Sequence, residues 1–128
     1  MLDEKIRRLA TEGANVAAVT TLMPDGTPQT TPVWIDADGD HLLVNTEVHR
    51  RKYRNTERDP RVTVAIWDVE QPYVYGEVRG KVVEAVTGPE ARAHIDALSR
   101  KYTGHDYANP IQSERVILKV APDRQYAR

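Results

Sequence analysis

The shortest connections in this sequence constrain the fold most, because they join β-prone runs through only a few turn-forming residues. Pro24–Gly26 separates the runs Val16–Leu22 and Gln29–Ile35. Proline presets its own φ angle and glycine accepts a positive one, so this connection predicts a β-hairpin. A second turn, Asp36–Asp40, leads to a third run, His41–Asn45. Strands joined this closely run antiparallel, and the pattern predicts a meander of these runs.

Further β-prone segments outnumber the helical ones in the rest of the chain. The other predicted strands are Arg61–Asp68, Tyr73–Val86 and Glu114–Pro122, and the predicted helices are Leu2–Ala10, a basic segment ending before Pro60, and Pro89–Tyr102. Gly76 and Gly80 predict bulges or bends in a long strand. Strands do not alternate with helices, which argues against a parallel Rossmann sheet. We predict a mainly β (α+β) fold, a six-stranded antiparallel barrel with flanking helices, and a single domain over residues 1–128.

Composition narrows the classes of function. The chain has 128 residues and no cysteine, which excludes disulfides, thiolate metal sites and a cysteine nucleophile. The charged start lacks the apolar stretch of a signal peptide, and no run is long enough to span a membrane, so we expect a cytoplasmic protein with no membrane partner. Acidic residues outnumber Lys and Arg by 19 to 18, which argues against nucleic acid as a partner.

One segment is nevertheless strongly basic. The stretch "HRRKYRNTERDPRV" concentrates positive charge in residues 49–62, directly after the polar pair Asn45-Thr46. Arg50, Arg51 and Lys52 on a short helix can bind a phosphate through charge-assisted hydrogen bonds. A solvated helix face and a nucleic-acid backbone remain alternative explanations.

Motifs for catalysis by side chains alone are missing. The four histidines are scattered without metal-ligand spacing, and neither a nucleophile with its base nor a carboxylate pair stands out. A bound cofactor would then carry the chemistry. Pro32 interrupts a strong strand, which predicts an edge-like or bent strand against which a flat ring can lie.

The order of these segments resembles a known family. "PDGTPQTTPVW", "LLVNTEVHRRKYRNTERDPRVTVAIWD" and "YVYGEVRGKVVE" together resemble the flavin and deazaflavin oxidoreductases of the FMN-binding split β-barrel superfamily, which are related to pyridoxamine-phosphate oxidase, and among them the coenzyme F420-dependent reductases. The resemblance implies a homodimer with the cofactor at the subunit interface. It implies these cofactor-binding residues: Thr31, Pro32, Val33 and Trp34 at the ring; Asn45, Thr46, Arg50, Arg51 and Lys52 at the phosphate; and Trp67, Tyr73 and Tyr75 lining the pocket or reaching it from the other subunit.

The same resemblance implies an F420H2-dependent reductase that transfers a hydride to a small electron-poor organic substrate. The arginine surplus favours F420, with its negatively charged tail, over FMN. Tyr102 and Tyr107 are candidate lid residues, a tyrosine or water would supply the proton, and the role of Arg79 stays open. The alternatives are an FMN-binding oxidase or reductase, a non-catalytic cofactor-binding protein, and a nucleic-acid-binding barrel.

Overall fold

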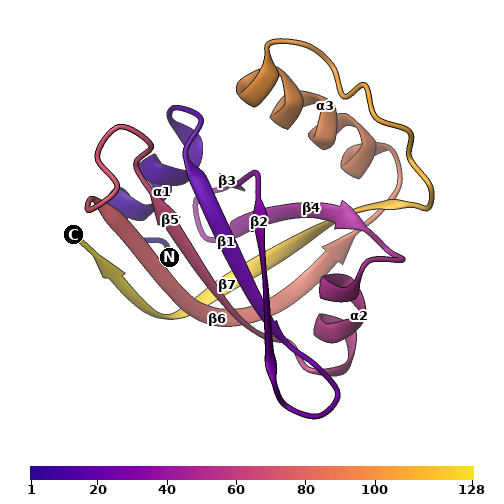
Figure 1. Ribbon diagram of the computed structural model, residues 1–128, viewed down its shortest axis with the longest axis horizontal. Coiled ribbons are helices and arrows are strands. Elements are labelled where there is room, and N and C mark those ends of the chain that lie inside the picture. Colours follow the sequence, from indigo (N-terminus) through magenta and orange to yellow (C-terminus); the bar gives the residue numbers. More distant parts are fainter.

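The computed structural model describes residues 1–128 as one curled antiparallel sheet with three helices (Figure 1). The strands are β1 (Val16–Leu22), β2 (Pro28–Val33), β3 (Asp36–Ala37), β4 (Leu42–Glu47), β5 (Arg61–Trp67), β6 (Tyr75–Val86) and β7 (Arg115–Ala127), and the helices are α1 (Glu4–Thr11), α2 (Arg51–Arg58) and α3 (Pro89–Thr103). The predicted mainly β fold of the split-barrel type is confirmed. The strand number is seven rather than six, because the predicted turn at Asp36–Asp40 begins with the two-residue strand β3.

The order of the strands is β2-β1-β5-β6-β7-β4-β3, so the predicted meander is only half right. The hairpin of β1 and β2 forms as predicted, with Ala18 opposite Pro32. However, β2 is an edge strand, and β4 pairs with β7 and β3 instead. Every residue of β4 is buried, whereas exposed residues alternate along β2. The main core covers one face of β4 at Leu42 and Val44, and Leu43 on the other face packs against Ala91 of α3. The missing N–H of Pro32 is tolerated at the edge.

The longest strands, β6 and β7, curl the sheet. Their pairing shifts register between Arg79 and Gly80 and again between Val82 and Glu84. The first of these shifts is the bulge that Gly80 predicted. A Cβ on Gly80 would lie 2.0 Å from the carbonyl oxygen of Ala121, so only glycine fits there. β7 continues past Pro122, where the sequence predicted its end; Pro122 stands opposite Gly80 at the irregularity, and a bulge is a place where a proline is tolerated in a sheet.

The helices cover the sheet at three places (Figure 1). Asp3 caps α1 by accepting hydrogen bonds from the backbone N–H groups of Lys5 and Ile6, and Ile6 and Ala10 are fully buried in the main core. In Figure 1, α3 and α2 lie on either side of the end of β4. None of the three helices has the length and the apolar run that crossing a membrane requires.

Candidate functional site

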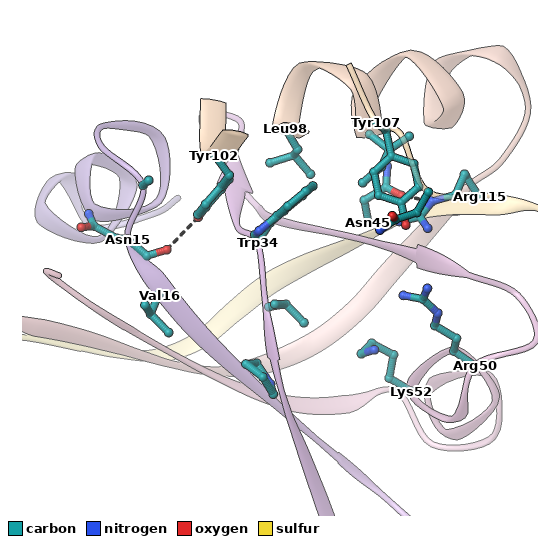
Figure 2. Close-up of a pocket in the computed structure, with 15 residues that line it drawn as sticks. Asn15, Val16, Trp34, Asn45, Arg50, Lys52, Leu98, Tyr102, Tyr107 and Arg115 are labelled. Carbon is teal, nitrogen blue, oxygen red and sulfur yellow. Dashed lines mark hydrogen bonds between the residues drawn. The ribbon is translucent and has the colours of Figure 1, made fainter. Parts of the chain in front are cut away.

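A cavity of about 560 Å³ opens where β2, β4 and β7 meet α2, α3 and the loop after α3 (Figure 2). Small-molecule sites typically have volumes of about 300–1,000 Å³, so this cavity has the size of a cofactor site. Its lining comprises cations (Arg50, Lys52, Arg115), aromatic side chains (Trp34, Tyr102, Tyr107), amides (Asn15, Asn45, Asn109) and apolar residues (Ala14, Val16, Pro32, Val33, Ile95, Leu98).

Lys52 is the most unusual of these residues. It lies in the first turn of α2, and only 9% of it is exposed. Its ammonium group points into the cavity, beside Arg50 (Figure 2). Burial, together with repulsion from Arg50 and Arg115, lowers the pKa of Lys52 below its usual value, and no acidic residue opposes this shift. A buried cation without a counterion is a place where an anionic ligand is favoured.

One carboxylate, Glu47 at the end of β4, balances part of this charge. It is 1% exposed, and its oxygens lie 3.3 Å from Arg50 and 3.5 Å from Arg115. It also accepts hydrogen bonds of 2.8 Å from the backbone N–H groups of Gln112 and Ser113. Burial favours the neutral acid, but these N–H groups and the two arginines outweigh it and lower the pKa of Glu47. Three cations therefore face the cavity against one carboxylate.

An aromatic wall forms another side of the cavity. The rings of Trp34 and Tyr102 stack at 5.3 Å with planes 9° apart, and Tyr107 meets Trp34 edge-on at 6.2 Å. The Tyr102 hydroxyl donates to the carbonyl oxygen of Asn15 at 2.7 Å and accepts from the N–H of Ile35 at 3.1 Å. These bonds hold Tyr102 as a fixed part of the wall rather than as a free lid.

Tyr107 is also anchored, although it belongs to the loop after α3. Its backbone N–H donates to Asp96 at 3.0 Å. The guanidinium of Arg115 lies 5.2 Å from the centre of its ring, a cation–π distance. The aromatic wall and the cations are thus in direct contact.

The structure brings half of the predicted site residues to the cavity. Pro32, Val33, Trp34, Asn45, Arg50 and Lys52 line it, whereas Thr31, Thr46, Arg51, Trp67, Tyr73 and Tyr75 do not. Neighbours along a strand point to opposite faces, so Thr46 is buried away from the cavity while Asn45 faces it. Arg51 is exposed on α2.

The three predicted aromatic residues lie elsewhere in the chain. Trp67 pairs with Tyr75 at the connection between β5 and β6, and Tyr75 packs against Tyr126 at 5.8 Å. Tyr73 is 85% exposed. In Figure 1 this connection lies at the α1 end of the sheet, away from α2. Within one chain these side chains therefore do not line the cavity.

Sequence reasoning missed Arg115, Asn15 and Asn109. Arg115 is only 4% exposed, directly before the apolar run Val116–Leu118 of β7, and a charge in that position is the one signal that pointed to it. Ile95 and Leu98 were assigned to the apolar stripe of α3, and the structure places them in the lining as well. The described residues contain no cluster of three His, Asp or Glu side chains that could bind a metal ion.

Comparisons with known proteins agree with this architecture. The family model of pyridoxamine 5'-phosphate oxidase matches residues 2–128. The solved structure of an F420 reductase is 30% identical in sequence, with a TM-score of 0.82 and coverage of 98% of both chains. No curated protein sequence is significantly similar.

Two more distant structures share the fold. Conserved hypothetical protein Rv2991 from Mycobacterium tuberculosis is 24% identical, with a TM-score of 0.72, and the match covers 98% of this chain and 82% of that one. General stress protein 26 from Bacillus anthracis is 22% identical, with a TM-score of 0.68 and coverages of 96% and 90%. With the matched family model, the split barrel and the cationic and aromatic cavity, the chain belongs to the pyridoxamine 5'-phosphate oxidase family of split-barrel oxidoreductases, which bind flavin or deazaflavin cofactors.

Proposed function

We propose that this protein is an F420H2-dependent oxidoreductase that reduces a small electron-poor organic substrate. The observation that carries the proposal is the buried, unpaired Lys52 beside Arg50 and Arg115, facing an aromatic wall across one cavity. A cofactor with a phosphate and a flat ring matches these two halves. The 30% identity to an F420 reductase over 98% of both chains favours F420 over FMN.

The side chains fit such a cofactor. Lys52, Arg50 and Arg115 would hold the phosphate, since an anion would offset the burial and the repulsion that lower the pKa of Lys52. The edge strand at Pro32 and Val33 and the stacked Trp34 would orient the ring and exclude water from one side of it. When bound, the reduced deazaflavin supplies the hydride. Tyr107 is the tyrosine of the wall whose hydroxyl makes no hydrogen bond to the backbone, so it is our candidate proton donor.

The choice of F420 over FMN rests in part on charge outside the cavity. Arg51 and Arg54 are exposed on α2, the helix that carries Lys52. F420 has a negatively charged tail that FMN lacks, and these arginines are our candidates to bind it. Arg58 has another role, since it donates a hydrogen bond to the carbonyl oxygen of Leu22.

We also propose a cytoplasmic homodimer in which a second copy completes the site. Val16 and Pro32 are exposed although they line the cavity, and Tyr73 is exposed far from it. A second copy would cover Val16 and Pro32 and would supply aromatic residues such as its own Tyr73 to the cavity.

Fluorescence and absorbance titrations with F420, FMN and an oligonucleotide test the proposal. We expect F420 to bind more tightly than FMN, and the oligonucleotide not to bind. The double variant Arg51→Met/Arg54→Met should weaken F420 binding by about tenfold, as expected for lost contacts to charged groups, and leave FMN binding unchanged. Tighter binding of FMN would overturn the choice of cofactor. Binding of F420 without oxidation of F420H2 by any of a panel of electron-poor acceptors would point to a non-catalytic cofactor-binding protein.

A further inference from the structure

A continuous chain of hydrogen bonds leads from Arg115 at the cavity, through Asn45 and α3, to β3. The Nε of Arg115 donates to Oδ1 of Asn45 at 2.9 Å, and Nδ2 of Asn45 lies 3.0 Å from Nδ1 of His94. The same Nδ2 donates to the carbonyl oxygen of Ala91 at 3.0 Å. On the other side of the imidazole, Nε2 of His94 lies 3.0 Å from Oδ2 of Asp36. Five side-chain and backbone groups from β7, β4, α3 and β3 thus form one network.

The chemistry of the two ends determines the direction of every bond in this network. An arginine side chain only donates, and a backbone carbonyl only accepts. Asn45 therefore has to present its oxygen to Arg115 and its NH2 group to Ala91 and His94. The NH2 group needs a lone pair on Nδ1 of His94, so the imidazole proton is on Nε2, where it donates to Asp36. This neutral tautomer alone satisfies all five groups.

We propose that neutral His94 is a positioning residue for the anion site: through Asn45 it aims the guanidinium of Arg115 into the cavity, and protonation of His94 weakens anion binding. The proposal deepens the proposed function and rests on it, because it assigns the anion site to the cofactor phosphate. A proton on Nδ1 would face the NH2 group of Asn45, donor against donor. Rotation of the amide would only move the conflict to Arg115 and Ala91, since both would then lose their partner.

The charged groups around His94 act in opposite directions. The negative charge of Asp36 in β3 favours the charged imidazole. Burial alone would raise the pKa of the Asp36 carboxyl, but hydrogen bonds from His94 and from the N–H of Ala37 hold this pKa below its usual value. The positive charge of Lys101 in α3 also lowers the pKa of Asp36. The positive charge of Arg115 in β7 opposes a second positive charge near Asn45. Glu47, beyond Arg115, is the remaining carboxylate of the network.

The sign of the pH effect separates this mechanism from simple electrostatics. A new positive charge near the cavity would by itself strengthen the binding of an anion at low pH. Loss of the hydrogen bond that holds Arg115 would weaken it. Sulfate is a suitable probe because it stays dianionic over the range in which imidazole side chains are protonated.

Two variants each keep one half of the histidine's contacts. In His94→Asn the amide oxygen takes the place of Nδ1, so Asn45 keeps an acceptor, while the contact to Asp36 is lost. In His94→Gln the amide reaches the position of Nε2, so the contact to Asp36 is kept and the acceptor for Asn45 is lost. Neither side chain titrates.

NMR titrations of sulfate from about pH 8 to about pH 5.5, the range of imidazole protonation, give the main readout. For the wild type we expect affinity to fall by about two- to tenfold on acidification, the value of one ordinary hydrogen bond. His94→Asn should keep the affinity of the wild type at pH 8 and lose the pH dependence. His94→Gln should bind weakly at both pH values.

The Nε–H signal of Arg115 in the ligand-free protein gives a second readout that needs no cofactor. It should shift and exchange faster with water on acidification of the wild type, and stay constant in His94→Asn. A constant signal in the wild type, or stronger sulfate binding at low pH, would overturn the proposal. A third outcome is that the Arg115 signal and sulfate binding change with pH as expected, but neither F420 nor FMN binds. This outcome would contradict the proposed function, while His94 would still position Arg115 for sulfate.

Discussion

At the scale of single residues, the cavity contains a buried positive charge that does not stabilise the fold. Lys52 is buried, has no acidic partner and faces two arginines. Burial of an unpaired charge lowers the free energy of unfolding, so Lys52 does not stabilise the fold, which is consistent with its proposed role in binding an anion. Glu47 differs, since donors from the backbone surround it.

Lys52→Met is therefore expected to stabilise the ligand-free protein and to weaken cofactor binding. The methionine fills the same space without the charge, and we expect the free energy of unfolding to rise by about 0.5–2 kcal/mol. Loss of a charged hydrogen bond should weaken the binding of F420 by about 10- to 150-fold. Chemical denaturation and fluorescence titration measure the two effects. Lys81→Met, at an exposed lysine of β6, is the matched control and should change neither; a destabilised Lys52→Met would contradict this reading.

The pH dependence of stability provides a separate test of the same lysine. Its pKa is lower in the folded state than the value of about 10.4 in the unfolded chain. The unfolded chain therefore binds more protons between the two values, and stability rises with pH in that window. The wild type should thus gain stability relative to Lys52→Met as the pH rises toward about 10.4, while its affinity for sulfate falls as Lys52 loses its proton. Parallel stability curves for the two proteins would show that the pKa of Lys52 is not lowered.

At the scale of elements, a glycine and a carboxylate shape the surroundings of the site. The register shift at Gly80 lets β6 and β7 cross closely and curl the sheet. Glu47 ties the loop after α3 to the end of β4 through two backbone N–H groups. That loop carries Tyr107 into the wall of the cavity.

Gly80→Ala is expected to be strongly destabilising. The added Cβ would meet the backbone of β7 at 2.0 Å, where no flexible side chain can move away. We expect a loss of about 2–4 kcal/mol in the free energy of unfolding, typical of overpacking against rigid neighbours. Gly39→Ala serves as the control, since a Cβ there has no atom within 4 Å. Equal effects of the two substitutions in thermal unfolding would argue against the close crossing of β6 and β7.

Glu47→Gln is expected to loosen the loop and to make stability less sensitive to acid. The amide keeps the shape but loses the charge that Arg50 and Arg115 contact, for an expected loss of about 1–3 kcal/mol at neutral pH. The pKa of Glu47 is lowered in the fold, so its contribution is complete above the unfolded value of about 4.3 and fades as the pH falls through the folded value. The stability difference between wild type and variant should therefore shrink below about pH 4. A difference that is constant down to acidic pH would assign the effect to packing alone.

At the scale of the whole molecule, the sheet leaves one side of the cavity open. The strand order ends at β2 on one edge and β3 on the other, and these edges do not pair with each other. Pro32 of the exposed edge belongs to the lining. The predicted aromatic residues Trp67, Tyr73 and Tyr75 lie at another part of the chain, which fits a site completed by a second copy.

Mixing two defective variants tests the proposed dimer. Lys52→Met and Tyr73→Ala should each bind F420 weakly, because each removes one chain's part of every site. In a mixed dimer, one site combines the intact Lys52 of one chain with the intact Tyr73 of the other, so refolding the two together should restore binding to up to half of the mixed dimers' sites. Sedimentation should give the mass of a dimer at micromolar concentration. A monomer that binds one F420 with full affinity would refute the shared site.

Local patterns in the sequence were enough to predict most elements. The hairpin of β1 and β2, the end of α2 before Pro60 and the bulge at Gly80 depend on φ angles and on missing N–H groups, which are properties of single residues. The same reasoning predicted Lys52 and Asn45 as candidate site residues, since a basic helix follows a polar strand end. It also predicted Pro32, Thr46, Arg50 and Arg51, and the family resemblance supplied the other candidates.

Only the tertiary structure decided which segments meet. β4 ends at Glu47 and pairs with β7, which begins 68 residues later at Arg115. This pairing brings Arg115 beside Asn45. The packing of α2 against β1 turns Lys52 toward the cavity and leaves the neighbouring Arg51 exposed. A sequence pattern specifies how a residue relates to its near neighbours, whereas the cavity is made by contacts between residues far apart in the chain. Those contacts depend on how the apolar side chains of the whole sheet are buried together, and no short segment contains that information.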